Sequence, residues 1–133
     1  MDCPECDSPT LSMAVPAEHR DHVPAESGAI AVCPRCLTLE PIGDAGAAGN
    51  DTDFSRISDA FPTDPESAVP LALAIGLCSS LATNRPAIEG LLESVERAGT
   101  DPLLVLDRLV ADPSVEPAVD LERRRHQLED LLY

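Results

Sequence analysis

Two short cysteine motifs decide the fold of this chain: Cys3-Pro4-Glu5-Cys6 and Cys33-Pro34-Arg35-Cys36, called here the first and the second knuckle. Each is a C-x2-C motif with a proline after its first cysteine. A two-residue spacer lets both sulfurs of a knuckle face one ion, and zinc accepts thiolate ligands readily. Four thiolates fill a tetrahedral zinc site completely. The motifs therefore predict one structural zinc ion bound by Cys3, Cys6, Cys33 and Cys36.

Iron binding and disulfide formation are the other possible chemistries of these thiols. A rubredoxin-like iron site uses the same four ligands, so iron stays open as the alternative metal. In a reducing compartment, paired C-x2-C motifs indicate a metal site and not disulfides. The fifth cysteine, Cys78, lies inside an apolar helical run. We expect Cys78 to be a small buried hydrophobic side chain.

The composition is strongly acidic. The 133 residues carry a formal net charge of −15, from 24 acidic and 9 basic residues, and every basic residue is arginine. Dense surface carboxylates keep proteins of salt-adapted organisms soluble, so the composition predicts a halophilic source. The alternative is a GC-rich genome, whose codons favour Arg and Ala. With two Phe, one Tyr and no Trp, the core must consist mainly of aliphatic side chains.

The chain carries no sign of membrane insertion or export. Its longest apolar run, Val69 to Leu77, is far shorter than the roughly 20 residues that span a bilayer. The N-terminal residues include neither a basic stretch nor the apolar core of a signal peptide. We expect a cytoplasmic protein with no membrane partner.

The pattern along the chain predicts the α+β class: a four-cysteine zinc ribbon of short antiparallel strands followed by a small helical bundle. In residues 1–42, apolar side chains alternate over Thr10–Val15 and Ala29–Val32, and Leu37–Glu40 is a third short strand. Polar residues between the first two strands predict a loop. Residues 43–52 hold three glycines and no large apolar side chain, which predicts a flexible linker.

Residues 53–133 are predicted to form the helical domain. Phe54, Ile57 and Phe61 share one face of a short docking helix over 53–61. Thr63-Asp64-Pro65-Glu66 and Thr100-Asp101-Pro102 each place a capping oxygen before a proline, which the first turn of a helix tolerates, and Thr63 with Glu66 also fits a capping box. Gly99 stands where a C-terminal cap belongs. The periodicity predicts four helices over about 65–82, 86–98, 102–111 and 117–132, the first of them apolar on nearly every side and therefore central.

Two further groups of polar residues are candidates for function. His19 and His22 stand three apart in the ribbon loop, where we expect solvated side chains; a second metal site or a catalytic pair is the alternative. Arg123-Arg124-Arg125-His126 is the one basic cluster, and a helix would pair Arg125 with Glu129 and Glu122 with His126. We expect a solvated, locally neutralised face, and a contact with a phosphate or a partner is the alternative. No recognisable catalytic constellation occurs in the sequence, so we predict no catalytic residues and no enzymatic activity.

The knuckles resemble the CPxC pattern of small archaeal zinc-ribbon proteins, and Gly28–Glu40 resembles the second half of a transcription factor B zinc ribbon. Those families place glycine after the second cysteine, where this chain has Asp7 and Leu37. These turns must therefore form without the freedom of glycine at positive φ. With Asp53–Phe61 and the stretch from Asp101 to Leu128 included, the chain resembles an uncharacterised haloarchaeal zinc-ribbon family of unknown function. The resemblance implies a haloarchaeal source and no activity.

These patterns lead to one leading hypothesis of function and one alternative. The first is a cytoplasmic protein-interaction or adaptor module with a structural zinc ion, whose partner is another protein. The alternative is a nucleic-acid-binding or transcription-associated zinc-ribbon protein. Nucleic-acid binding generally needs a basic stripe, often with aromatic side chains for stacking, and this chain has the opposite charge balance. The sequence does not indicate an oligomeric state.

Overall fold

The computed structural model describes residues 3, 9–23, 28–42, 54–113, 115–116 and 120–132. Within these residues the chain is α+β, as predicted, with a three-stranded antiparallel sheet and four α-helices. Pro4, Glu5 and Cys6 of the first knuckle and the whole predicted linker, residues 43–52, lie outside the described residues. The predicted division into ribbon, linker and helical domain stays a prediction.

The sheet has the strand order β1-β2-β3, with both pairs antiparallel. β1 (Leu11–Ala14) buries alternate residues, which is the period-two pattern of a strand with one covered face. β2 (Ala29–Val32) is the central strand and is buried throughout. β3 (Leu39–Pro41) returns along β2, with Val32 opposite Leu39. Residues 33–38, which contain the second knuckle, are therefore the loop of the β2–β3 hairpin.

The segment between β1 and β2 differs from the loop that the sequence predicted. It contains a 3-10 helix, η1 (Ala17–His22). This helix follows Pro16, whose carbonyl accepts a hydrogen bond from the backbone N–H of His19 at 2.9 Å. Val23 at its end is buried in the main core. A stretch that is mostly polar in sequence is thus held against the protein by a few inward-facing side chains.

The helices begin and end largely where their capping residues predict. The Asp64 side chain accepts a hydrogen bond from Glu66 N at 3.0 Å, and the Asp101 side chain accepts one from Leu103 N at 3.1 Å. Gly99 follows the second helix with a φ of 96°, a conformation that glycine adopts without strain. The four helices are α1 (Pro65–Leu77), α2 (Leu81–Arg97), α3 (Pro102–Ala111) and α4 (Leu121–Leu132).

The predicted boundary between the first two helices is wrong. α1 ends at Leu77, a 3-10 turn η5 (Cys78–Ser80) follows, and α2 already begins at Leu81. Pro86 therefore lies inside α2 and not in its first turn. The Asn84 side-chain amide donates a hydrogen bond to the Leu77 carbonyl at 3.2 Å, which closes the turn between the two helices.

The predicted docking helix over 53–61 is also shorter than expected. It contains one 3-10 turn, η4 (Phe54–Arg56), followed by turns. Its three apolar residues are buried as the spacing predicted, and the rings of Phe54 and Phe61 stack with centroids 6.5 Å apart. The segment is further held by Ser58, whose hydroxyl donates to the Asp112 carboxylate at 2.6 Å.

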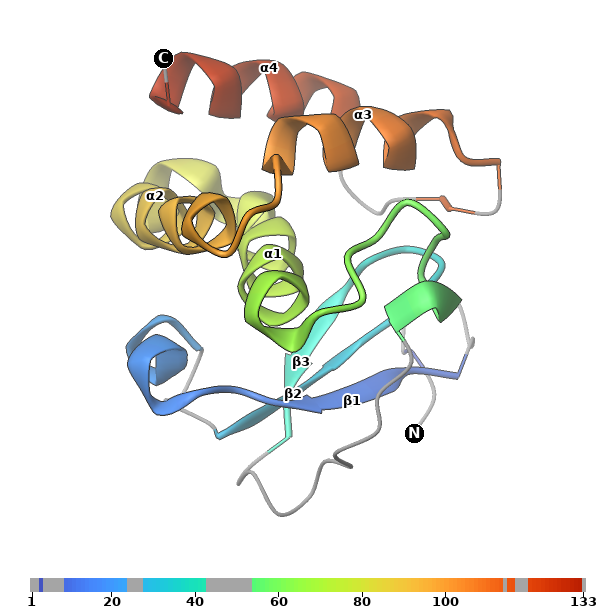
Figure 1. Cartoon of the computed structure of the whole chain (residues 1–133), viewed down its shortest axis with the longest axis vertical. Coiled ribbons are helices and arrows are strands. Elements are labelled where there is room, and N and C mark those ends of the chain that lie inside the picture. Colours follow the sequence, from blue (N-terminus) through green and yellow to red (C-terminus); the bar gives the residue numbers. More distant parts are fainter. Residues whose placement is uncertain are drawn as a thin grey trace.

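α1 occupies the centre of the fold, between the sheet and the upper helices (Figure 1). Residues 67–75 of α1 are all buried, which confirms the prediction of a central helix. Buried side chains of β1, β2 and the hairpin loop belong to the same hydrophobic cluster as those of the helices. The described parts of the predicted ribbon and of the predicted helical domain therefore share one core.

The sheet and α1 meet at a glycine. A Cβ added at Gly76 would lie 2.5 Å from Leu39 Cβ and 2.8 Å from Leu39 Cδ1. Real Cβ atoms do not approach another carbon this closely, so any side chain at residue 76 would push β3 away from α1. Gly76 thus sets the distance between the hairpin and the central helix.

We expect Gly76→Ala to lower the free energy of unfolding by about 1–3 kcal/mol, the usual cost of overpacking a core. The matched control is Gly90→Ala in α2, where the nearest atom to the added Cβ is His22 Nε2 at 3.9 Å. Without a clash, alanine in a helix should stabilise the protein by about 0.5–1 kcal/mol. Urea unfolding of the two variants checks this. Equal stabilities would show that the Gly76 contact does not constrain the packing.

Candidate metal centre

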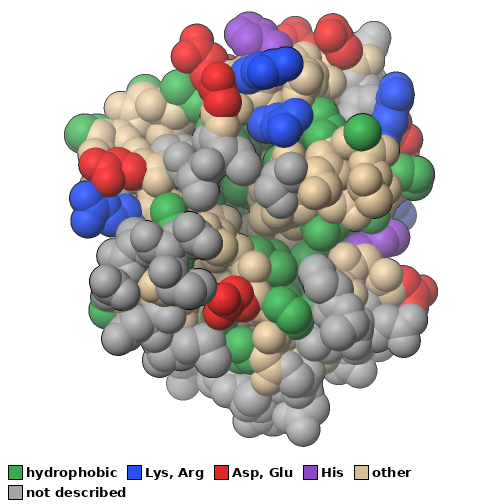
Figure 2. All heavy atoms as spheres, turned by 180° about the vertical axis from the view of Figure 1, so that it is seen from behind, with side chains coloured by type: hydrophobic (Ala, Val, Ile, Leu, Met, Phe, Trp, Pro, Cys, Tyr) green, Lys and Arg blue, Asp and Glu red, His purple; other side chains and the backbone are tan. Residues whose placement is uncertain are grey.

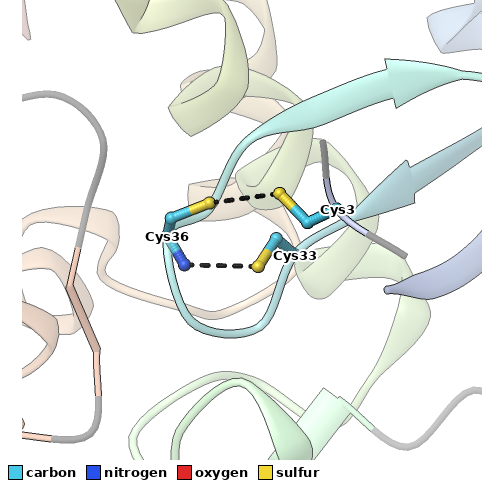
Figure 3. Close-up of side chains that lie close together, drawn as sticks. All are labelled: Cys3, Cys33 and Cys36. Atoms are coloured by element: carbon cyan, nitrogen blue, oxygen red, sulfur yellow. Dashed lines mark hydrogen bonds between the residues drawn. The ribbon is translucent and has the colours of Figure 1, made fainter. Parts of the chain in front are cut away.

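Cys3 meets Cys33 and Cys36, the two cysteines of the second knuckle, at one end of the sheet (Figure 3). The Sγ atoms of Cys3, Cys33 and Cys36 all lie within 4.8 Å of one another, and those of Cys3 and Cys36 are 3.5 Å apart. The three side chains are 1%, 0% and 7% exposed. Cys6, the fourth predicted ligand, lies outside the described residues. Three of the four predicted thiols are thus brought together in a closed, buried cluster that could hold a metal ion.

The hairpin loop presents its two sulfurs through a specific set of hydrogen bonds. Cys33 N donates to the Thr38 carbonyl at 3.0 Å and Leu37 N donates to the Cys33 carbonyl at 2.9 Å, which closes the loop. Cys36 N points at Cys33 Sγ at 3.4 Å, as the dashed line in Figure 3 marks. An N–H group aimed at a sulfur stabilises the negative charge of a thiolate. The loop is therefore shaped for coordinating sulfurs.

Leu37 completes this turn in an unusual conformation. Its φ is 63°, in the left-handed region that glycine usually occupies. For an L-residue this conformation costs about 1–2 kcal/mol. The Leu37 side chain is only 4% exposed and belongs to the main core, so its burial offsets the backbone strain. The turn that the sequence predicted to form without glycine does so by anchoring a leucine in the core.

The tip of the second knuckle is tied to the connection between α3 and α4. The Arg35 guanidinium donates twice to Glu116 Oε2, at 3.0 Å from Nε and 2.8 Å from Nη2. The backbone adds a third bond, from Glu116 N to the Arg35 carbonyl at 2.7 Å. Both side chains are about half exposed, so the ion pair itself contributes little stability. The ion pair instead helps to fix the position of the knuckle, because it ties Arg35 to Glu116, which lies 81 residues later in the chain.

The cysteine cluster is the one candidate metal site in the part of the chain that the structure describes. Cys78 is not part of it. Cys78 is fully buried in the main core, as predicted, and burial raises the pKa of its thiol to about 11 despite the opposing charge of Arg124. It is a neutral thiol at pH 7, and it packs like a small hydrophobic side chain.

The prediction for the two histidines holds only in part. His19 is 7% exposed and not solvated, because η1 turns it inward against the protein. Burial lowers the pKa of His19, and the Glu18 carboxylate, 3.7 Å from its Nε2, offsets part of that effect. His22 is partly exposed. No alternating or helical period marked His19 as buried, so sequence reasoning missed it.

In the basic cluster on α4, Arg125 is neutralised as predicted, whereas no carboxylate of the described residues lies within ion-pair distance of Arg123 or Arg124. Arg125 pairs with Glu129 one turn along and also with Asp107 of α3, where Nε lies 2.8 Å from Oδ1. This second partner was not predicted, and it joins α4 to α3. Arginine, acidic and histidine side chains stand together at the α4 end of the molecule in Figure 2. The cluster is therefore no uninterrupted basic stripe.

The strained turn generates a testable difference between two leucines. Leu37→Val removes one methylene and places a β-branched residue at positive φ, where such residues are outliers. Leu11→Val makes the same change at a similarly buried position in β1, where valine is favoured. We expect Leu37→Val to lose about 1 kcal/mol or more beyond the loss of Leu11→Val, measured by urea unfolding. A difference near zero would contradict the strain assigned to Leu37.

Comparisons with known proteins give a family and no function. No curated protein and no solved structure matches the chain. Among the described residues, no helix is both long and apolar enough to cross a membrane. A family model described as a family of unknown function (DUF6276) matches residues 2–132, and this description names neither a zinc ribbon nor a source organism. Because the match spans nearly the whole chain, the protein belongs to the DUF6276 family of unknown function.

Proposed function

We propose that the protein binds one structural zinc ion through four thiolates. The proposal rests on one observation: Cys3, Cys33 and Cys36 are buried together, and their sulfur atoms lie within 4.8 Å of one another, as the ligands of one ion would. Cys6 supplies the fourth ligand in this proposal, because a C-x2-C spacer lets its sulfur face the same ion as Cys3. Thiolate ligands favour zinc over the hard cations magnesium and calcium.

The proposed role of the ion is structural and not catalytic. A zinc ion with four protein ligands has no position for water or substrate. The three described sulfurs are nearly inaccessible to solvent, so a substrate would have no path to the ion. The ion would join the N-terminal segment to the β2–β3 hairpin and contribute directly to folding.

We expect one zinc ion per chain in the purified protein, measured by elemental analysis. Cobalt substituted for zinc should show the absorption of four thiolates with no exchangeable ligand. Cys33→Ser and Cys6→Ser should each lose the bound metal, because a closed site needs all its ligands. Cys78→Ala is the matched control, since Cys78 lies in the main core and not in the cysteine cluster, and it should keep one ion per chain.

Three results of this experiment would contradict the assignment. Iron in the purified native protein would show that the metal is iron and not zinc. Full zinc occupancy in Cys6→Ser would show that the fourth ligand is another group. Loss of the metal in Cys78→Ala would show that the cysteine cluster is not the site.

For the protein as a whole we propose a non-enzymatic role as a protein-interaction or adaptor module in the cytoplasm. Three features support this proposal: a closed metal site, the lack of a catalytic constellation in the sequence, and a surface that is acidic overall. The nucleic-acid alternative has less support. Arg125, at the centre of the α4 basic cluster, is already held by two carboxylates and is not available to a phosphate.

The interaction proposal predicts a specific protein partner. Tagged full-length protein should recover the same partner repeatedly at molar salt after nuclease treatment, and the two purified proteins should elute together in gel filtration. The matched bait is Cys33→Ser, which should lose the partner if the metal-held fold presents the contact surface. Recovery of nucleic acid in place of a protein, or of no reproducible partner, would count against the adaptor role.

A further inference from the structure

A cavity of about 350 Å³ lies between α2 and α4, away from the cysteine cluster. A volume of this size is typical of sites for small molecules. α2 lines the cavity with two apolar residues and one arginine, and α4 lines it with polar residues. The lining residues are Leu81, Ala82 and Arg85 of α2 with Arg124, Gln127 and Asp130 of α4.

The two arginines of this cavity have spare hydrogen-bonding capacity. Arg124 donates from Nη1 to the neutral amide oxygen of Gln127 at 2.8 Å, and no carboxylate of the described residues lies within ion-pair distance of it. The nearest carboxylate oxygen to Arg85 Nε belongs to Glu89 at 3.8 Å, too far for a hydrogen bond. A guanidinium carries five donors in a planar fork that matches a carboxylate.

The setting of Arg124 contrasts with that of its neighbour on α4. Arg125 forms ion pairs with two carboxylates, whereas Arg124 has none within ion-pair distance among the described residues of a chain with 24 acidic residues. The Cys78 thiol does not supply a counter-charge to Arg124 either, because it is fully buried and neutral. The cavity thus offers a part-buried guanidinium, without a carboxylate partner among the described residues, beside apolar surface.

We propose that this cavity binds a small organic monocarboxylate with an apolar body. The carboxylate is held by the guanidinium groups of Arg124 and Arg85, and the apolar body covers Leu81 and Ala82. Inorganic phosphate has no apolar body to cover Leu81 and Ala82, and the Asp130 carboxylate of the lining repels its higher charge more strongly, so we expect it to bind less well than such a monocarboxylate. This site is independent of the metal centre and of the proposed adaptor role.

The test is a titration of the metal-loaded full-length protein with benzoate, acetate and inorganic phosphate, followed by amide chemical shifts in NMR. We expect saturable shifts in α2 and α4 with benzoate, several-fold weaker binding of acetate, and weaker binding still of phosphate. Phosphate that binds as tightly as benzoate would overturn the proposal. Saturation by none of the three probes would overturn it as well.

Three variants separate this site from general charge effects. Arg124→Gln should weaken benzoate binding about 10-fold to 100-fold, the range expected for losing a charge-assisted hydrogen-bonded pair. Arg123→Gln removes the same charge one residue away, outside the cavity lining, and should change the affinity less than twofold. Ala82→Leu keeps every charge but fills the apolar wall, and it should abolish the binding. Equal affinities of Arg124→Gln and Arg123→Gln, or unchanged binding by Ala82→Leu, would refute the assignment.

Discussion

α1 is apolar around its whole circumference, and a helix of this kind is stable in water only when other elements cover every side of it. The sheet covers one side, α2 covers another, and the segment from Phe54 to Phe61, with three buried apolar side chains, precedes it in the chain. Gly76 allows β3 to come into close contact with α1. The position of the hairpin, and with it the position of the second knuckle, therefore follows from the need to bury this helix.

The same constraint explains how a candidate metal site can be built on so little sheet. Strands of four, four and three residues are too short to be stable as an isolated sheet. Here α1 supplies the missing apolar surface, and Leu37 links the hairpin loop to the same core at the expense of backbone strain. The Arg35–Glu116 bonds hold the tip of the loop from the outside. The cysteines are thus positioned by contacts with the helices as well as by the hairpin itself.

Local signals in the sequence predicted local structure well. Asp64, Asp101 and Gly99 marked helix ends because capping depends only on neighbouring backbone groups. Pro86 led to a wrong prediction of where the second helix begins, because it lies inside α2. A proline inside a helix is tolerated when the surrounding packing offsets the lost hydrogen bond, and no local sequence pattern indicates that packing.

Most contacts between residues far apart in the chain could not be predicted from the sequence. The C-x2-C spacing predicted that two knuckles would share a metal, and the structure brings Cys3 to Cys33 and Cys36. Nothing in the sequence indicated that Arg35 would contact Glu116, or that His19 would be buried. Both depend on how the hairpin and η1 pack against the helices, and that packing is set by surfaces far apart in the chain.

The acidic composition also gives the position of each arginine more weight than it would have in a neutral protein. With 24 carboxylates and 9 guanidinium groups, an arginine can find a partner almost anywhere on the surface. Arg35 pairs with Glu116 and so joins the hairpin loop to the connection between α3 and α4. Arg125 pairs with Asp107 and so joins α4 to α3. Arg124 points into a cavity beside a neutral amide. What distinguishes Arg124 is its place beside the apolar side chains of a cavity, where an anion with an apolar body can contact both.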